Sequence, residues 1–378
     1  MSFKDEKIKQ RKLEHIEITL KENVESKSFI TFNDIVFVHK ALPEVDLDKI
    51  DTKVRFLKYT LNAPLIVSAI TGGHPLSYKI NKAIAEAISE LKLGMGVGSQ
   101  RAALKDPSLK YTFAIAREIA SSRPIIANIG LAQLVKETNI NQIIDIVNMI
   151  EADALAIHLN PAQEVFQAEG DTSFKGAIKA IERILNEINV PIIIKEVGTG
   201  LSKEVALQLA QIGIRYFDVA GTGGTNWILI ELIRARKTGK KEIEEIGRNF
   251  ITWGIPTPAS IIEVFYSVPQ AYIIGSGGIR TGLDIAKALA LGADLTAIAK
   301  PVLEKAINGA KEVVNLLNKL INELKITMLL CGCNYIHELY KAPISLSTSI
   351  TNYLKYRGID IKKYEKLRIV KSERLKVK

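Results

Sequence analysis

The sequence has few of the features expected of a secreted or membrane protein. Its 378 residues contain two cysteines, Cys331 and Cys333, which are poorly spaced for a disulfide and have no second cluster to complete a zinc site. No apolar run approaches the length of about 18 residues needed to span a bilayer. The opening residues, MSFKDEKIKQRK, lack the apolar segment of a secretory signal. We therefore expect a reduced, cytoplasmic protein.

Positive charge is in excess, with 51 Lys and Arg against 41 Asp and Glu and a formal net charge of +10. Such an excess is typical of proteins that bind polyanions, membrane surfaces or phosphorylated substrates. The excess lies at the ends, because residues 355–378 hold ten basic and three acidic side chains and residues 1–12 hold five and two. The remaining chain is balanced, which argues against nucleic acid and membrane partners. The basic C-terminal tail is interpreted as a solvated fringe.

Short apolar runs alternate with amphipathic stretches of helical length from residue 60 onward. The runs are apolar throughout rather than alternating, which is typical of strands buried on both faces of a parallel sheet. They predict strands at 64–69, 94–97, 124–128, 154–159, 191–195, 216–220, 271–275 and 295–299. Helices are expected at 77–91, 108–121, 141–150, 174–188, 203–211, 257–265, 283–291 and 304–324.

Eight such strand–helix units without a Pro-, Gly- or Ser-rich linker predict an α/β fold, the (β/α)8 TIM barrel. A doubly wound open sheet is the alternative. We expect an N-terminal extension at 1–60 that carries part of the substrate site, the barrel at 61–325, and a helical annex with the basic tail at 326–378. A hairpin is expected around residues 29–38. The charged insertion at 226–254 is expected to be a lid or an interface element.

The active site of such a barrel lies at the carboxyl ends of its strands, and the loops there are rich in glycine and polar residues. The segment from Gly277 to Arg280, before a helix, matches the barrel phosphate site after strands seven and eight. This site fits a phosphosugar, pyridoxal phosphate or a flavin. Lys195, at the end of strand five, would form an imine with pyridoxal phosphate or act as a fixed cation beside a flavin. A structural alternative is an ion pair of Lys195 with Glu164 or Glu196.

The loop after the fourth strand, HLNPAQE, is a second polar cluster. His158 and Asn160 lie two residues apart and so face the same side of a strand. Together with Gln163 and Glu164 they offer too few ligands for zinc but enough for Mg²⁺ shared with a diphosphate. Arg101, just past a buried strand, is well placed to bind phosphate.

The order of several motifs resembles one family, the type 2 isopentenyl diphosphate isomerases. RKLEH, AITGG, GSQR, NIG, HLNPAQE, KEVG, AGTGGTNW, GSGGIR and ALALGAD follow one another between Arg11 and about Pro301. The resemblance implies a homo-oligomeric, FMN- and Mg²⁺-dependent enzyme, a tetramer or octamer, that interconverts isopentenyl and dimethylallyl diphosphate. It also implies a reduced flavin, regenerated by NAD(P)H, that acts as acid and base. Ile70 is a departure, since the family often has methionine there.

The resemblance also implies three sets of site residues. The diphosphate substrate would contact Arg11, Lys12, Ser99, Gln100, Arg101, His158, Asn160 and Gln163. FMN would contact Ala69, Ile70, Thr71, Ser99, Asn128, Lys195, Thr225, Gly277, Gly278, Ile279, Arg280, Ala299 and Lys300. The catalytic residues would be Gln163, Glu164 and Lys195, with Glu164 as the ligand of Mg²⁺.

Two other classes of protein are considered. An FMN oxidoreductase of the 2-hydroxyacid oxidase or dihydroorotate dehydrogenase type would share the barrel and the phosphate site. The first uses a His–Arg pair where this chain has AGTGGT, and the second a Ser or Cys base where it has HLNPAQE. A nucleic-acid or membrane binder driven by the basic tail would bind with steep salt dependence and carry no flavin colour.

Overall fold

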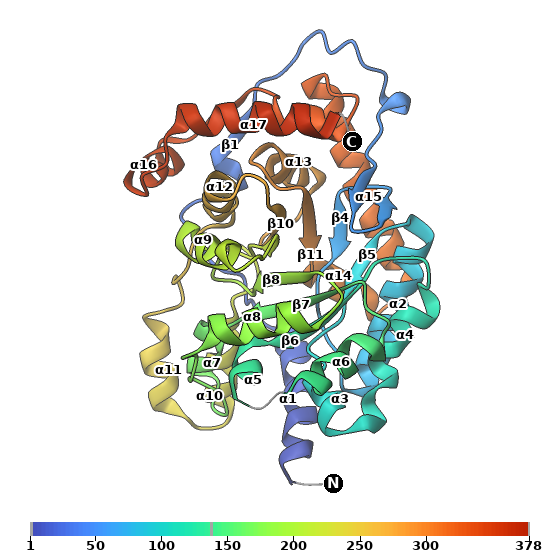
Figure 1. Cartoon of the computed structure of the whole chain (residues 1–378), viewed down its shortest axis with the longest axis vertical. Helices are drawn as coiled ribbons and strands as arrows, with labels where there is room; N and C mark the ends of the chain where they lie inside the picture. Colours follow the sequence, from blue (N-terminus) through green and yellow to red (C-terminus); the bar gives the residue numbers. More distant parts are fainter. Residues whose placement is uncertain (1–2, 137–138, 377–378) are drawn as a thin grey trace.

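The computed structural model describes residues 3–136 and 139–376 and contains a closed barrel of eight parallel strands (Figure 1). The last strand of the series pairs with the first, so the (β/α)8 prediction is confirmed and the open sheet is wrong. The strands, in barrel order, are β4 Leu65–Val67, β5 Gly94–Gly96, β6 Ile125–Gly130, β7 Ala154–Leu159, β8 Ile192–Glu196, β9 Tyr216–Asp218, β10 Tyr272–Ser276 and β11 Leu295–Ile298.

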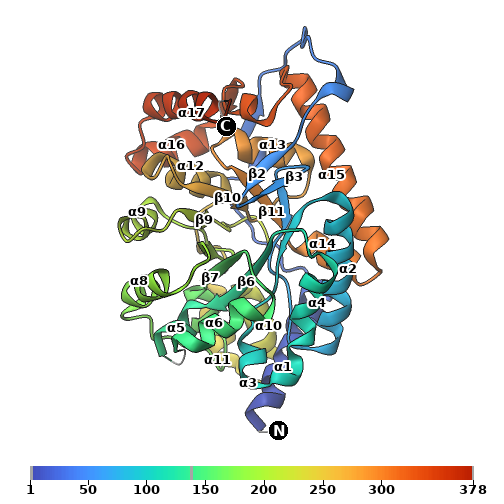
Figure 2. The same cartoon turned by 45° about the vertical axis from the view of Figure 1, so that its right-hand side comes forward.

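Helices surround the barrel on its outer side (Figures 1 and 2). Asn139 and Ser202 cap two of them by accepting hydrogen bonds from backbone amides of the first turn, as their positions in the sequence indicate. The stretch expected to be one helix at 304–324 is divided in two, because Gly309 has a φ of 109° that a helix does not allow. The helices are α2 Pro75–Leu91, α3 Arg101–Lys105, α4 Tyr111–Ile119, α5 Leu131–Lys136, α6 Ile140–Met149, α7 Pro161–Phe166, α8 Ala177–Glu187, α9 Lys203–Gln211, α10 Trp227–Lys237, α11 Lys241–Arg248, α12 Thr257–Ser267, α13 Gly282–Ala290, α14 Lys300–Ala306 and α15 Ala310–Cys331.

The N-terminal extension contains a hairpin, but in another place than expected. Strands β2 Val54–Phe56 and β3 Tyr59–Leu61 form it, and Phe56 and Leu61 pack on apolar residues inside the barrel. The hairpin expected around residues 29–38 is wrong. Strand β1 Ile35–Phe37 pairs instead with β12 Ile344–Leu346, near the other end of the chain. A local apolar pattern predicts a strand but does not identify a distant partner.

The basic C-terminal tail is a packed helix rather than a solvated fringe. Beyond a short helix η4 (Ile336–Tyr340) and α16 Thr348–Tyr356, helix α17 Ile361–Lys376 buries one face, with Tyr364, Arg368 and Lys371 all below 7% exposed (Figure 1). These positions lie on one side of a helix. The charge count missed this packing because composition carries no information about periodicity. The last two residues of the tail lie outside the described residues.

Helix α1 Phe3–Lys21 packs against α3, α10 and α14. It is dark blue in Figures 1 and 2 and runs down to the N-terminus. Within residues 3–136 and 139–376, none of the helices combines the length and the apolar character that crossing a bilayer requires.

Candidate active site

A large cavity opens at the carboxyl ends of the barrel strands, and residues at the end of every strand contribute to its wall. Helix α1 contributes Arg11, Lys12 and His15. The cavity brings together nearly all of the residues that the sequence analysis selected. These are Arg11, Lys12, Ala69, Ile70, Thr71, Ser99, Arg101, Asn128, His158, Asn160, Gln163, Glu164, Lys195, Thr225, Gly277, Gly278, Ile279, Arg280, Ala299 and Lys300.

Gln100, expected to contact the substrate, does not line the cavity. Its side chain is fully buried and its amide donates to the carbonyl of Ile146 at 2.9 Å. Its Oε1 accepts a hydrogen bond from the backbone amide of Asn128 at 3.1 Å. The Gln100 side chain therefore does not reach the cavity, contrary to the expectation, and instead supports the end of β6 and the position of Asn128.

One wall of the cavity has the backbone of an anion cradle. Gly277 and Gly278 have φ angles of 98° and 82°, which only glycine adopts readily. A Cβ atom at Gly277 would lie 2.4 Å from the carbonyl oxygen of Gly221, so the two strand-end loops pack too closely for any side chain there. Consecutive amides in such conformations bind anions. The predicted phosphate loop therefore has the form that a phosphate group requires.

Two cations, Arg280 and Lys300, stand beside this cradle and share one carboxylate. Glu25 accepts from Arg280 at 2.6 Å and from Lys300 at 3.0 Å. Burial by itself would raise the pKa of Glu25, but the two cations outweigh it and lower the pKa. Glu25 therefore stays ionised and holds both cations at the cavity wall. The sequence analysis did not select it, because nothing local to the segment after α1 indicates this contact.

Lys195 lies at the end of β8, with its side chain in the cavity wall. Its ammonium pairs with Asp218 at 3.0 Å and donates to the carbonyl of Glu196 at 2.9 Å. The predicted ion pair of Lys195 with the carboxylate of Glu164 or Glu196 is therefore wrong. Successive side chains alternate between the two faces of a strand, and Asp218 is the register partner of Lys195 on β9. The Glu196 carboxylate instead accepts from backbone amides of the following loop.

His158 is held in one orientation by Asn128. The Asn128 amide donates to the carbonyl of Val97 at 3.1 Å, which turns its Oδ1 toward His158 Nδ1 at 2.8 Å. Nδ1 is therefore the protonated nitrogen of the neutral ring. Burial, followed by the charges of Lys12 and Lys195, lowers the pKa of His158 to about 3. At neutral pH His158 is thus an uncharged imidazole.

Glu164 and Asn160 are hydrogen-bonded to each other at the start of α7. Glu164 is 6% exposed and accepts from Asn160 Nδ2 at 3.1 Å and from the Asp171 amide at 2.8 Å. Asn160 Oδ1 is buried without a hydrogen-bond partner. The described residues include no group of three or more His, Cys, Asp or Glu side chains around one point. One carboxylate and one amide oxygen suit Mg²⁺, which keeps several waters and binds substrate phosphates.

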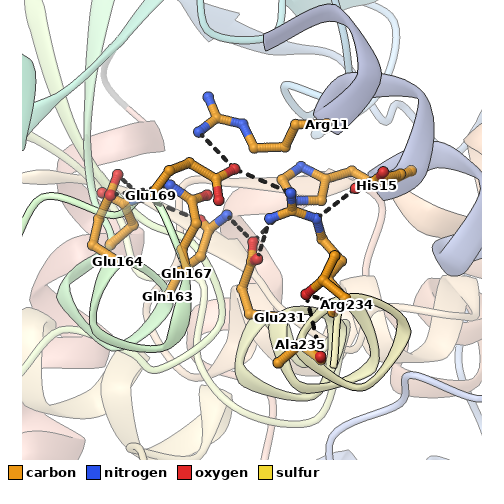
Figure 3. Close-up of polar contacts among 12 residues, drawn as sticks. Arg11, His15, Gln163, Glu164, Gln167, Glu169, Glu231, Arg234 and Ala235 are labelled. Carbon is orange, nitrogen blue, oxygen red and sulfur yellow. Dashed lines mark hydrogen bonds and ion pairs between the residues drawn. The ribbon is translucent and has the colours of Figure 1, made fainter. Parts of the chain in front are cut away.

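An ion-pair network joins α1 to α10, a helix of the insertion (Figure 3). Arg234 donates to Glu14 on α1 at 2.9 Å, to Glu169 at 3.0 Å and to Glu231 at 2.6 Å. Arg11 lies 3.5 Å from the same Glu169 oxygen. The insertion, expected to be a lid or an interface element, thus holds α1 over the cavity.

Glu231 connects this network to the predicted catalytic glutamine. Its Oε1 accepts from His15 at 2.9 Å and from Gln163 Nε2 at 3.2 Å (Figure 3). Burial would raise the pKa of Glu231, but His15 and Arg234 outweigh it and lower the pKa to about 2. The ionised carboxylate therefore fixes the amide orientation of Gln163.

The sequence analysis missed Asp218, Glu231 and Arg234. A signal existed for the two carboxylates, because each interrupts an apolar run, YFDVA and WILIELI. A charge inside a buried run needs a partner, and such groups are frequent at functional sites. Arg234 lies in a charged stretch and offers no such contrast.

The chain is similar to several known proteins. The profile of the FMN-dependent dehydrogenase family matches residues 131–346. The isopentenyl-diphosphate delta-isomerase of Sulfurisphaera tokodaii is 46% identical over 97% of this chain and 99% of that protein. The enzyme of the same name from Metallosphaera sedula is 43% identical, over 95% and 98%.

Solved structures show the same fold at much lower identity. A mandelate oxidase variant is 16% identical, with a TM-score of 0.62 over 91% of this chain and 100% of that chain. A flavocytochrome b2 variant is 18% identical, with a TM-score of 0.62 over 87% and 82%. This chain thus shares its fold with these oxidases, but its sequence is much more similar to those of the delta-isomerases. The chain belongs to the FMN-dependent, type 2 isopentenyl-diphosphate delta-isomerase family.

Proposed function

We propose that this protein uses FMN and Mg²⁺ to interconvert isopentenyl diphosphate and dimethylallyl diphosphate. One observation carries the proposal beyond the relatives' names: a single cavity is lined by two groups of residues that suit anions. The first is the glycine cradle with Arg280 and Lys300, and the second is the group of cations on α1 and α3, Arg11, Lys12 and Arg101. A flavin phosphate and a substrate diphosphate require this combination.

FMN fits the first site and the strand ends next to it. Gly277, Gly278, Ile279, Arg280, Ala299 and Lys300 would hold its phosphate, and Ala69, Ile70, Thr71, Ser99, Asn128, Lys195 and Thr225 would line its ring. Bound and reduced by NAD(P)H, FMN would supply the acid and base that an allylic isomerisation needs. The ammonium of Lys195 would stabilise negative charge on the ring.

The substrate diphosphate fits the second site. Arg11, Lys12 and Arg101 supply positive charge, and Ser99, His158 and Asn160 supply polar contacts. Glu164 and the unpartnered oxygen of Asn160 would hold Mg²⁺ against the diphosphate. Gln163, oriented by Glu231, would face the isoprenoid carbons. These contacts would hold the alkene in place, which favours the transfer of protons at carbon.

An FMN oxidoreductase is the second candidate, since 2-hydroxyacid oxidases share the barrel. The loop after β9, where those enzymes would carry a His–Arg pair, runs from Gly221 to Thr225 without either residue. This favours the isomerase. A cytoplasmic location stays a prediction from the sequence, and a tetrameric or octameric assembly stays an implication of the family resemblance.

The decisive test combines colour and product. We expect the purified protein to show the absorbance bands of bound FMN, because the cradle and its cations fit the cofactor. Incubated with reductant, Mg²⁺ and isopentenyl diphosphate, it should form dimethylallyl diphosphate, measured by chromatography. A colourless protein, or a flavoprotein that oxidises lactate but leaves isopentenyl diphosphate unchanged, would contradict the proposal.

Diphosphate binding should depend on the charge of Lys12. Burial, followed by the charges of Arg11 and Arg101, lowers the pKa of Lys12 to about 7. A bound anion favours the ammonium form and raises that pKa, so binding above pH 7 takes up a proton. The affinity should therefore fall as pH rises through about 7, by up to about tenfold per pH unit.

Calorimetry with inorganic pyrophosphate between about pH 6 and pH 9 measures this dependence. The variant Lys12→Met is the control, because the ratio of the two affinities cancels the ionisation of pyrophosphate itself. A ratio that stays constant across this range rules out the titration of Lys12.

A further inference from the structure

Three charged or polar side chains stand side by side at the carboxyl ends of neighbouring strands. His158 on β7 is in register with Lys195 on β8, and Lys195 is in register with Asp218 on β9. His158 and Lys195 line the cavity, as does Ser276 at the end of the next strand, β10. Asp218 is not among the lining residues and is 4% exposed. Its carboxylate therefore acts on the cavity through its neighbours.

The carboxylate of Asp218 connects two of these lining residues. Its Oδ2 lies 3.0 Å from the ammonium of Lys195, and its Oδ1 accepts a hydrogen bond from the hydroxyl of Ser276. The Lys195 ammonium also donates to the carbonyl of Glu196 at 2.9 Å. An ammonium has three donors, so two fixed acceptors set the direction of the third. The orientation of Lys195 is thus built into the barrel wall.

The geometry points to Asp218 as a positioning residue that presents the Lys195 ammonium to the flavin ring. This inference rests on the proposed function only in requiring FMN in the cavity. A four-carbon side chain such as that of Lys195 is flexible and occupies one place only when its charged end is held. The alternative is that Asp218 only neutralises a buried charge, without deciding where the ammonium lies.

The reduction potential of bound FMN distinguishes these two roles. A cation held at the ring stabilises the reduced, negatively charged flavin, so Lys195→Met should shift the midpoint potential to a more negative value. In a protein whose Lys195 ammonium is no longer held by Asp218, Lys195→Met should shift the midpoint potential much less than it does in the wild type. Asp218→Ala removes the carboxylate and should therefore reduce the Lys195→Met shift by at least half.

Asp218→Asn is the matched control. It removes the same charge as Asp218→Ala but keeps an oxygen for the ammonium and an amide that can donate to the Ser276 hydroxyl. Under the positioning role, the Lys195→Met shift in the Asp218→Asn background should be close to that in the wild type, whereas in the Asp218→Ala background it is at most half as large. A role in charge neutralisation alone predicts that the alanine and asparagine variants behave alike.

The experiment is a double-mutant cycle on the FMN-loaded proteins, with potentials measured by reductive titration followed by absorbance. Wild type, Lys195→Met, each Asp218 variant and the two double variants are compared. Equal Lys195→Met shifts in the wild-type and Asp218→Ala backgrounds would overturn the inference. If Asp218→Ala takes up no FMN, Asp218→Val, which fills a similar space without a carboxylate, replaces it. Isomerisation by the wild type is assayed in parallel, so that an additive cycle in an active isomerase contradicts the positioning role alone.

Discussion

Replacing Glu164 by Gln should lower the isomerisation rate about 100- to 1,000-fold. A divalent cation held between the Glu164 carboxylate and the substrate diphosphate would contribute several kcal/mol to binding and orienting the substrate, and each ~1.4 kcal/mol is a factor of ten in rate. The substitution removes the carboxylate that is hydrogen-bonded to Asn160, the residue whose Oδ1 is buried without a partner. The Mg²⁺ concentration needed for half-maximal turnover should rise with it. Both quantities come from initial rates of dimethylallyl diphosphate formation over a Mg²⁺ titration.

Two controls separate this effect from a general disturbance of the fold. Glu182→Gln makes the same chemical change at an exposed position of α8 and should leave turnover unchanged. FMN uptake by Glu164→Gln should equal that of the wild type, because the flavin site lies on other strand ends. Undiminished turnover with an unchanged Mg²⁺ dependence would refute the assignment of Glu164 to the metal.

Replacing Lys371 by Met should lower the free energy of unfolding by about 3–5 kcal/mol. The Lys371 ammonium is buried and contacts Asp294 at 2.6 Å and the carbonyl of Gly292 at 2.8 Å. It also lies over the rings of Phe265 and Tyr340. The substitution leaves the Asp294 carboxylate buried without its countercharge. Urea unfolding followed by circular dichroism measures the change.

Lys366→Met is the matched control, since Lys366 is exposed on the same helix α17. Its effect should stay within about 0.5 kcal/mol. The double variant Lys371→Met, Asp294→Asn should regain part of the lost stability, because no unpaired charge then remains. Equal losses for Lys371→Met and Lys366→Met would show that the buried pair does not hold the C-terminal helix to the barrel.

Much of the site was predictable because barrel topology converts sequence positions into spatial ones. A residue that follows a buried parallel strand must lie at the carboxyl end of the barrel, so Ser99, His158 and Lys195 converge whatever their separation in the chain. The same rule wrongly predicted that the Gln100 side chain lines the cavity, because strand order predicts where a loop lies but not the direction of each side chain. Gln100 points toward the carbonyl of Ile146, away from the cavity.

The partners of buried charges were beyond the sequence. The sequence suggested Glu164 or Glu196 as the partner of Lys195, whereas the register of β8 and β9 places Asp218 beside it. The contact of Glu25 with Arg280 joins residues 255 positions apart in the chain. No local sequence pattern predicts such a contact, since it depends on where the segment after α1 lies relative to the barrel.

The sequence by itself determined the eight strand–helix units, the end of the barrel that carries chemistry and the family to which the chain belongs. These features follow from local periodicity and from motif order, and a single chain displays both. Only the tertiary structure decided that the basic tail is a packed helix, that α1 lies over the cavity and that Asp218 faces Lys195. Each of these features depends on which residues, distant in the sequence, come into contact. The free energy of a buried charge depends on whether such a contact supplies a countercharge or a hydrogen-bond partner.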